Sequence, residues 1–153
     1  MDIHPGLSAL EAAVGTETGP TDWFTVDQER INAFADATED HQWIHVDSDR
    51  AASGPFGTTV AHGFLTLSLV PYLSAQLRRV DGVRMGINYG LDRVRFPAPV
   101  PAGARLRARS TLIRCEPVSG VPDAAQLVNR ITIEIEGSAK PACVAEVVSR
   151  LFF

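Results

Sequence analysis

The sequence is poor in cysteine. Its 153 residues include two cysteines, Cys115 and Cys143, too few for the disulfide framework of a small secreted domain, and paired Cys/His motifs of a structural zinc site are missing. A chain of this length buries roughly 68–70% of its unfolded surface, so its core needs no such crosslink. We expect both thiols to be reduced and partly buried.

Export and membrane signals are also missing. The first residues contain neither a basic cluster nor an apolar segment, so we expect a cytoplasmic protein. Residues 51–77 contain no Asp, Glu, Lys or Arg, but Gly54, Pro55 and Gly57 interrupt the first part of this run. The roughly 16 residues that follow are shorter than the ~20 that a membrane-spanning helix needs. No linker, repeat or low-complexity tract occurs, so we expect one domain over residues 1–153 and no membrane association.

Positive charge is scarce overall but concentrated in one part of the chain. The net charge of −4 argues against a general nucleic-acid-binding protein. Residues 78–114 nevertheless carry nine arginines against two acids, whereas residues 1–77 carry two arginines against eleven acids. Guanidinium groups match the geometry of phosphate oxygens. The basic segment is therefore either a site that attracts an anionic ligand or a solvated face of strands.

Periodicity predicts helices first and strands afterwards. Thr25 and Gln28 have the spacing of a capping box, and the apolar residues that follow predict a helix over about 26–37. Asp47 is a suitable N-cap for a second short helix, and the segment 38–46 between them is expected to be non-helical. Alternating apolar residues predict a strand from Val83 with a register change near Asp92-Arg93, followed by strands over 104–115, 125–136 and 142–152.

The segment from His62 to Leu77 is apolar on nearly all sides, which is typical of a helix enclosed by protein, and Pro71 is expected to kink it. It is the only element apolar enough to fill one face of the sheet. We therefore expect an α+β domain in which an antiparallel sheet wraps around a long central helix. One helix leaves sheet edges uncovered, so self-association is also expected.

Asp40 and His45 are the main catalytic candidates. In a loop, a carboxylate and an imidazole five residues apart can converge on one water molecule, which neutral imidazole can deprotonate. This spacing is common by chance, so a loop carboxylate and a surface histidine remain the simpler interpretation of the pair alone. His41 and His45 could also be read as metal ligands, but a third ligand is not evident and we predict no metal.

His62 and Gly63 stand at the head of the apolar helix. The unpaired N–H groups of a first helical turn can stabilise an oxyanion, and glycine allows a carbonyl to approach its amide closely. Equally, Gly63 could serve tight packing against the sheet, and His62 could be a buried histidine or a helix cap. Trp43 and Phe56 are expected to shape an apolar wall.

Several motifs together resemble a known family. They are Phe34 to Asp47, Gly54-Pro55-Phe56-Gly57, Ala61-His62-Gly63-Phe64, Asn88-Tyr89-Gly90 and Arg93-Val94-Arg95-Phe96-Pro97. With these, nearly the whole chain resembles the MaoC-like dehydratases, the single hot-dog (R)-specific enoyl-CoA hydratases, and in particular the branch similar to nodulation protein N. In the family motif Gly-Asp-x-Asn-Pro-aliphatic-His, the Asp and His activate water. Asp40 and His45 match this pair, whereas Glu39, Gln42 and Trp43 depart from its Gly, Asn and Pro.

The resemblance implies a hot-dog homodimer of fatty acid metabolism that reversibly hydrates trans-2-enoyl-CoA to (R)-3-hydroxyacyl-CoA without a cofactor. It assigns catalysis to Asp40 and His45, and we expect the amide of Gly63 to supply the oxyanion contact. Acyl-CoA is an anion with three phosphate groups, which the arginines of the basic segment would bind. The expected substrate contacts are Trp43, Phe56, His62, Phe64, Arg84, Arg93 and Arg95. A hot-dog acyl-CoA thioesterase, a dehydratase of an unusual acyl thioester and a non-catalytic acyl-CoA-binding subunit remain alternatives.

Overall fold

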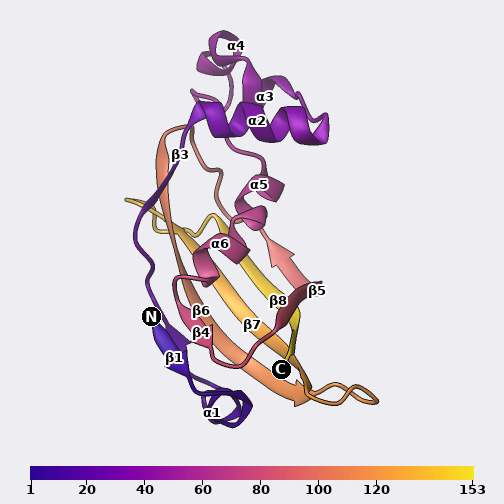
Figure 1. The fold of residues 1–153 in the computed structure, drawn as a ribbon. Coiled ribbons are helices and arrows are strands. Elements are labelled where there is room, and N and C mark those ends of the chain that lie inside the picture. The colour runs from indigo at the N-terminus through magenta and orange to yellow at the C-terminus, as the bar shows by residue number, and fades with distance from the viewer.

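A curved antiparallel sheet forms one wall of the molecule, and helices lie along its concave side and beyond one end (Figure 1). The computed structural model describes all 153 residues. Four long strands, in the order β6-β7-β8-β5, make up most of the sheet. They are β5 (Met85–Arg95), β6 (Ala104–Pro117), β7 (Ala124–Ile135) and β8 (Cys143–Phe152). The short strands β2 (Glu17–Thr18) and β3 (Phe24–Val26) both pair with the far side of β6.

The strand β5 is irregular and lies at an edge of the sheet. Its register with β8 shifts between Asn88 and Gly90 and again between Leu91 and Arg93. The second shift confirms the register change expected near Asp92-Arg93. A β-bulge of this kind turns successive side chains to the other face of the strand.

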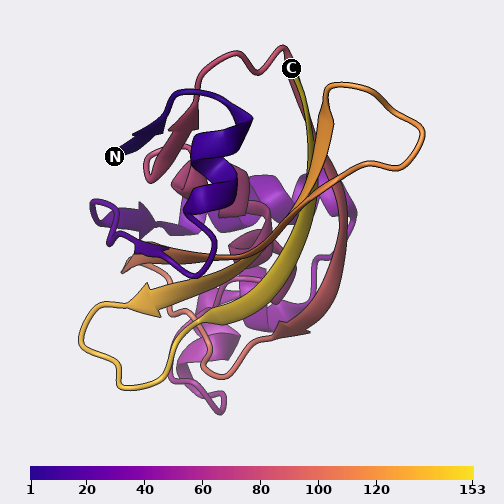
Figure 2. The same ribbon diagram turned by 90° about the horizontal axis from the view of Figure 1, so that it is seen from below.

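The central helix runs along the concave face, as expected, but it is interrupted. The predicted helix over 62–77 is wrong in its continuity, because the structure has α5 (Gly63–Ser68) and α6 (Val70–Ser74) in its place. Pro71 has no N–H to donate to the carbonyl four residues earlier, which explains a break at this point. Figure 2 shows the long strands curving around these helices. Their buried side chains join the inner face of the sheet in one core of 17 residues.

Three helices stand beyond one end of the sheet: α2 (Gln28–Thr38), α3 (Trp43–Val46) and α4 (Ser48–Ala52). The capping box at Thr25 is wrong. Asp27 is the N-cap, and its carboxylate accepts the Arg30 N–H at 2.9 Å. The non-helical prediction for 38–46 is wrong for the single turn of α3. Asp47 caps α4 as predicted, accepting the Arg50 N–H at 3.0 Å.

The first residues form a small unit that periodicity did not reveal. The parallel strands β1 (Asp2–His4) and β4 (Arg78–Val80) pair with each other, and α1 (Leu7–Ala12) packs Leu10 into a second apolar cluster. Elements of three to six residues are too short to show a period. None of the helices is long and apolar enough to cross a membrane.

Candidate active site

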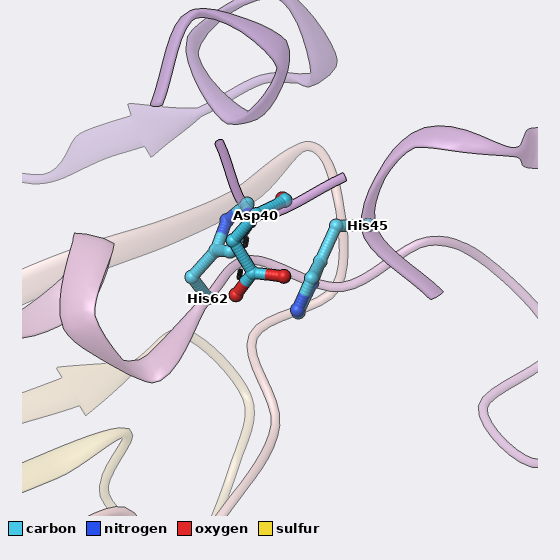
Figure 3. A group of neighbouring side chains, drawn as sticks. All are labelled: Asp40, His45 and His62. Carbon is cyan, nitrogen blue, oxygen red and sulfur yellow. Dashed lines mark hydrogen bonds and ion pairs between the residues drawn. The ribbon is translucent and has the colours of Figure 1, made fainter. Parts of the chain in front are cut away.

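Asp40, His45 and His62 come together between the helical end of the molecule and the start of α5 (Figure 3). One carboxylate oxygen and one nitrogen from each ring lie within 4.8 Å of one another. Glu39 ends α2 in the left-handed conformation, at φ 60°, so the chain turns and Asp40 leaves the helix. Three separate segments therefore build the cluster, of which the sequence spacing indicated the pair Asp40 and His45.

His45 is held in one tautomer. Its side chain is buried, and its Nδ1 lies 2.6 Å from the carbonyl oxygen of Val60. A carbonyl only accepts, so Nδ1 carries the hydrogen and Nε2 has the free lone pair. The Asp40 side chain is 54% exposed. A basic nitrogen thus lies beside a carboxylate that solvent reaches, the arrangement needed to hold and deprotonate a water molecule.

His62 is buried and contacts both residues of this pair. Only 3% of the residue is exposed, and its ring stacks on that of His45 with centroids 3.7 Å apart. Its Nε2 donates to the backbone carbonyl of Asp40 at 2.9 Å and lies 4.0 Å from the Asp40 carboxylate. Phe34 covers the ring at 5.0 Å. His62 therefore fixes the positions of both candidate catalytic residues.

Gln28 is a residue of the site that sequence reasoning missed. Its side-chain amide donates to the backbone carbonyl of His45 at 2.8 Å, and its carbonyl oxygen accepts from the hydroxyl of buried Thr59. It thereby ties α2 to α3 and to the segment that carries Val60. The sequence spacing places Gln28 in a capping box with Thr25, and no local sequence pattern indicates a contact between residues 31 positions apart.

Gly63 is the first residue of α5, where the backbone N–H has no partner within the helix. Phe96 packs directly against it. A Cβ built on Gly63 would lie 2.9 Å from Cδ2 of Phe96, so the glycine is required for packing whether or not its amide also binds an oxyanion. Both interpretations made from the sequence remain compatible with this geometry.

The predicted apolar contacts differ in their surroundings. Trp43 lies under the guanidinium of Arg50, at 4.4 Å from the ring centroid, and against Gly54. Phe56 is 45% exposed and Phe64 is 69% exposed. Phe64 has an edge-on contact with Phe96 at 6.1 Å between ring centroids, but both phenylalanines offer open apolar surface.

The three predicted arginines do not converge. Arg84 precedes β5, whereas Arg93 and Arg95 lie at the other end of that strand, the end beside α5 (Figure 1). Val94 packs on the core, so its two neighbours point to the outer face, where they line a cavity of about 190 Å³ with Arg130. Strand alternation explains this placement.

The alternative pair of metal ligands is not assembled. His41 is exposed and its Nε2 contacts the carboxylate of Asp36 at 2.9 Å, away from His45. In the cluster itself, His45 Nδ1 and His62 Nε2 are both engaged by backbone carbonyls. The ligand atoms left without such a contact are the Asp40 carboxylate, His45 Nε2 and His62 Nδ1, the last of which is buried and has no hydrogen-bond partner.

Comparison with known proteins gives consistent results. The protein family described as "MaoC like domain" matches this chain over residues 9–132. The chain is 57% identical over 150 residues to 3-hydroxyacyl-thioester dehydratase Z of Mycobacterium tuberculosis, covering 98% of each chain. It is 44% identical over 151 residues to nodulation protein N of Rhizobium leguminosarum, covering 96% of this chain and 91% of the relative.

Solved structures share the fold. The monoamine oxidase regulatory protein from Archaeoglobus fulgius superposes with a TM-score of 0.78 at 19% identity, over 98% of this chain and 95% of that one. The (R)-hydratase from A. caviae superposes with a TM-score of 0.66 at 26% identity, over 89% and 94% of the two chains. These matches confirm the α+β hot-dog fold. With the match over residues 9–132, they show that the chain belongs to the MaoC-like dehydratase family.

Proposed function

We propose that this protein reversibly hydrates a trans-2-enoyl-CoA to the (R)-3-hydroxyacyl-CoA. The observation that carries the proposal is the Asp40 carboxylate clustered with the imidazole of His45, whose Nδ1 donates to the carbonyl of Val60. The family is one of dehydratases, and two of the relatives described above are a 3-hydroxyacyl-thioester dehydratase and an (R)-hydratase. The first name supports chemistry on the C2–C3 bond of an acyl thioester, and the second supports the addition of water with (R) stereochemistry.

The proposed step needs one water molecule and no cofactor. Asp40 and His45 hold the water, and His45 Nε2 takes its proton as the oxygen bonds to C3 of the substrate. The C2–C3 π electrons move toward the thioester carbonyl, and the pair then returns a proton to C2. Water and proton come from the same side, so the addition is syn. General acid–base catalysis of this kind contributes roughly 10²–10⁴ in rate.

The enolate that develops on the thioester oxygen needs a hydrogen-bond donor. We assign this to the amide of Gly63, at the start of α5. Loss of one such donor typically lowers kcat by ~10²–10³. The acyl chain would meet Trp43, Phe56 and Phe64 on the surface around the cluster. His62 contributes by fixing Asp40 and His45.

The phosphates of CoA would meet arginine. Arg93 and Arg95 are the stronger candidates, because their end of β5 lies beside α5, whereas Arg84 lies at the opposite end. Two free cysteines are present, Cys115 and Cys143, which suits a reducing compartment and supports a cytoplasmic location.

We also infer a homodimer that forms through the open edge of β5. This edge carries four large apolar side chains with more than two fifths of their surface exposed: Met85, Ile87, Tyr89 and Leu91. An edge strand has unpaired backbone N–H and C=O groups, and antiparallel pairing with a second copy would satisfy them and cover this apolar surface.

The test is the loss of enoyl-thioester absorbance when purified protein is mixed with crotonyl-CoA. Asp40→Asn and His45→Gln are expected to abolish the change, and His41→Asn, which alters an exposed histidine outside the cluster, is the matched control. Full activity in both site variants would overturn the assignment. Release of free CoA thiol instead of hydration would identify a thioesterase, and binding without turnover would identify a non-catalytic subunit.

A further inference from the structure

A cavity of about 560 Å³ lies between α6 and the concave face of the sheet, apart from Asp40 and His45. Ten of the 18 residues that line it are hydrophobic, and a volume of this size is in the range of small-molecule sites. Helix α6 ends at Ser74, and the turn that follows leads into β4. The cavity is lined by residues of α6, of the segment that follows it and of the strands β5, β6, β7 and β8.

One arginine in the lining of this cavity lacks its full set of hydrogen-bond partners. Arg78, on β4, donates from Nη1 to the side-chain carbonyl of Asn129 at 2.9 Å. Its Nε and Nη2 are buried and have no hydrogen-bond partner in the protein. Arg78 forms no salt bridge, although Asp2 is its register partner in the neighbouring strand β1. A buried cation normally has an anionic partner or a complete set of acceptors.

Further polar groups lie on the same wall. The hydroxyl of Ser74 is buried and also lacks a partner, and the hydroxyl of Ser110 contacts Asn129 at 3.5 Å. Ser74, Arg78, Ser110 and Asn129 all line the cavity. Burial lowers the pKa of Arg78, against the opposing charge of Asp2. An arginine retains its charge even so, because the guanidinium group is too basic to lose its proton in a protein.

The rest of the lining is aliphatic. Val70 and Pro71 come from α6, Ile87 from β5, and Leu127 and Ile131 from β7. These side chains favour a hydrocarbon chain, while the two free N–H groups of one guanidinium match the two oxygens of a carboxylate. A neutral apolar ligand would leave the guanidinium unpaired, and a small inorganic anion would leave the aliphatic wall unused.

We infer that this cavity binds an aliphatic carboxylate, with the carboxylate on Nε and Nη2 of Arg78 and the hydrocarbon chain between α6 and the sheet. We assign a second donor to the hydroxyl of Ser74, which lines the same cavity and has no partner in the protein. The site is separate from the proposed water-activating pair and does not require it. The carboxylate belongs either to a free fatty acid or to the far end of an acyl thioester.

The test compares decanoate with decanol, which has the same chain length and no charge, by isothermal titration calorimetry. Decanoate is expected to bind at least about tenfold more tightly, the usual effect of a hydrogen bond to a charged group. Arg78→Gln should reduce decanoate to the affinity of decanol. Arg79→Gln, which removes an exposed arginine paired with Asp81, should leave both affinities unchanged.

A second variant covers the case in which Arg78→Gln does not fold. Asn129→Asp places a carboxylate on the existing Arg78 contact, so it should block decanoate by occupying the guanidinium and leave decanol binding intact. Equal binding of decanoate and decanol to the natural protein would overturn the proposal. Survival of tight decanoate binding in a folded Arg78 variant would overturn it too.

The two sources of the carboxylate are separated by turnover. If it belongs to the substrate, an enoyl-CoA with a terminal carboxyl group should have a higher kcat/KM than the plain enoyl-CoA of equal length, and Arg78→Gln should remove the difference. If it is a free fatty acid, the two substrates should react alike while decanoate still binds. This arm alone rests on the proposed hydratase function, and its failure would leave the calorimetric result standing.

Discussion

The imidazole of His62 stacks on that of His45, with ring planes 25° apart, and reaches past it to hold the backbone of Asp40. Two variants separate these contacts. His62→Phe keeps an aromatic ring but loses the hydrogen bond to Asp40, whereas His62→Gln keeps a donor and loses the ring. Because a hydrogen bond contributes about 1 kcal/mol, we expect His62→Phe to lower kcat by roughly fivefold to tenfold.

The measurement is kcat and KM for crotonyl-CoA, with thermal unfolding as a check on folding. His62→Gln should retain more of the natural kcat than His62→Phe. A change confined to KM in both variants would place His62 against the substrate, as first expected from the sequence, and contradict a positioning role.

A second prediction concerns Gly63 and Phe96. Gly63→Ala places a methyl group 2.9 Å from the Phe96 ring, and overpacking of this kind costs about 1–3 kcal/mol of unfolding free energy. Phe96→Leu in the same chain should recover much of that loss. Urea unfolding measures the stability, and kcat measured in the double variant tests the amide. A normal kcat there is expected if Gly63 acts through its backbone N–H, because the N–H survives the substitution. Activity lost despite recovered stability would contradict this reading.

The sequence revealed those parts of the site that depend on neighbours along the chain. Asp40 and His45 are only five positions apart in the sequence, although they lie after α2 and in α3, and Pro71 indicated the interruption of the central helix. It could not reveal contacts that depend on tertiary structure. The acceptor for His45 is a backbone carbonyl, and Gln28 reaches it from another helix. In the same way, Thr25 has the right spacing for a cap, but the carboxylate of Asp27 lies closer to the first turn and takes that role.

The positions of the arginines in the basic segment, residues 78–114, could not be predicted from the sequence either. The positive charge of this segment was evident from composition. The direction in which each arginine side chain points, however, depends on strand register and on which face of the strand packs against the core. Arg93 and Arg95 point to the outer face, whereas Arg78 turns into a cavity. Neither outcome follows from counting charges, because one residue of register reverses the face.

A third prediction is a pH dependence of stability. The hydrogen bond from His41 to the Asp36 carboxylate raises the pKa of His41 above its usual 6.5. A raised folded-state pKa stabilises the protein below the unfolded pKa, and this contribution is lost as pH rises through the folded pKa. Asp36→Asn removes it. Urea unfolding of both proteins should therefore show a larger difference at pH 5.5 than at pH 8.5. Equal differences at the two pH values would show that this pair adds nothing.

The last prediction tests the dimer at the edge of β5. Leu91, 46% exposed, stands near the middle of this strand, so in an antiparallel pair of identical strands its two copies would lie close together. Leu91→Lys would bring two like charges into that interface and bury them against apolar side chains. Because opposed like charges across paired strands are destabilising, we expect the variant to be a monomer by light scattering after size exclusion, and the natural chain to be a dimer. Val121→Lys alters a residue that is similarly exposed, at 39%, in a loop away from this edge, and should leave the dimer intact. A Leu91→Lys protein that remained dimeric, with Val121→Lys also dimeric, would exclude β5 as the interface and place the contact on another surface.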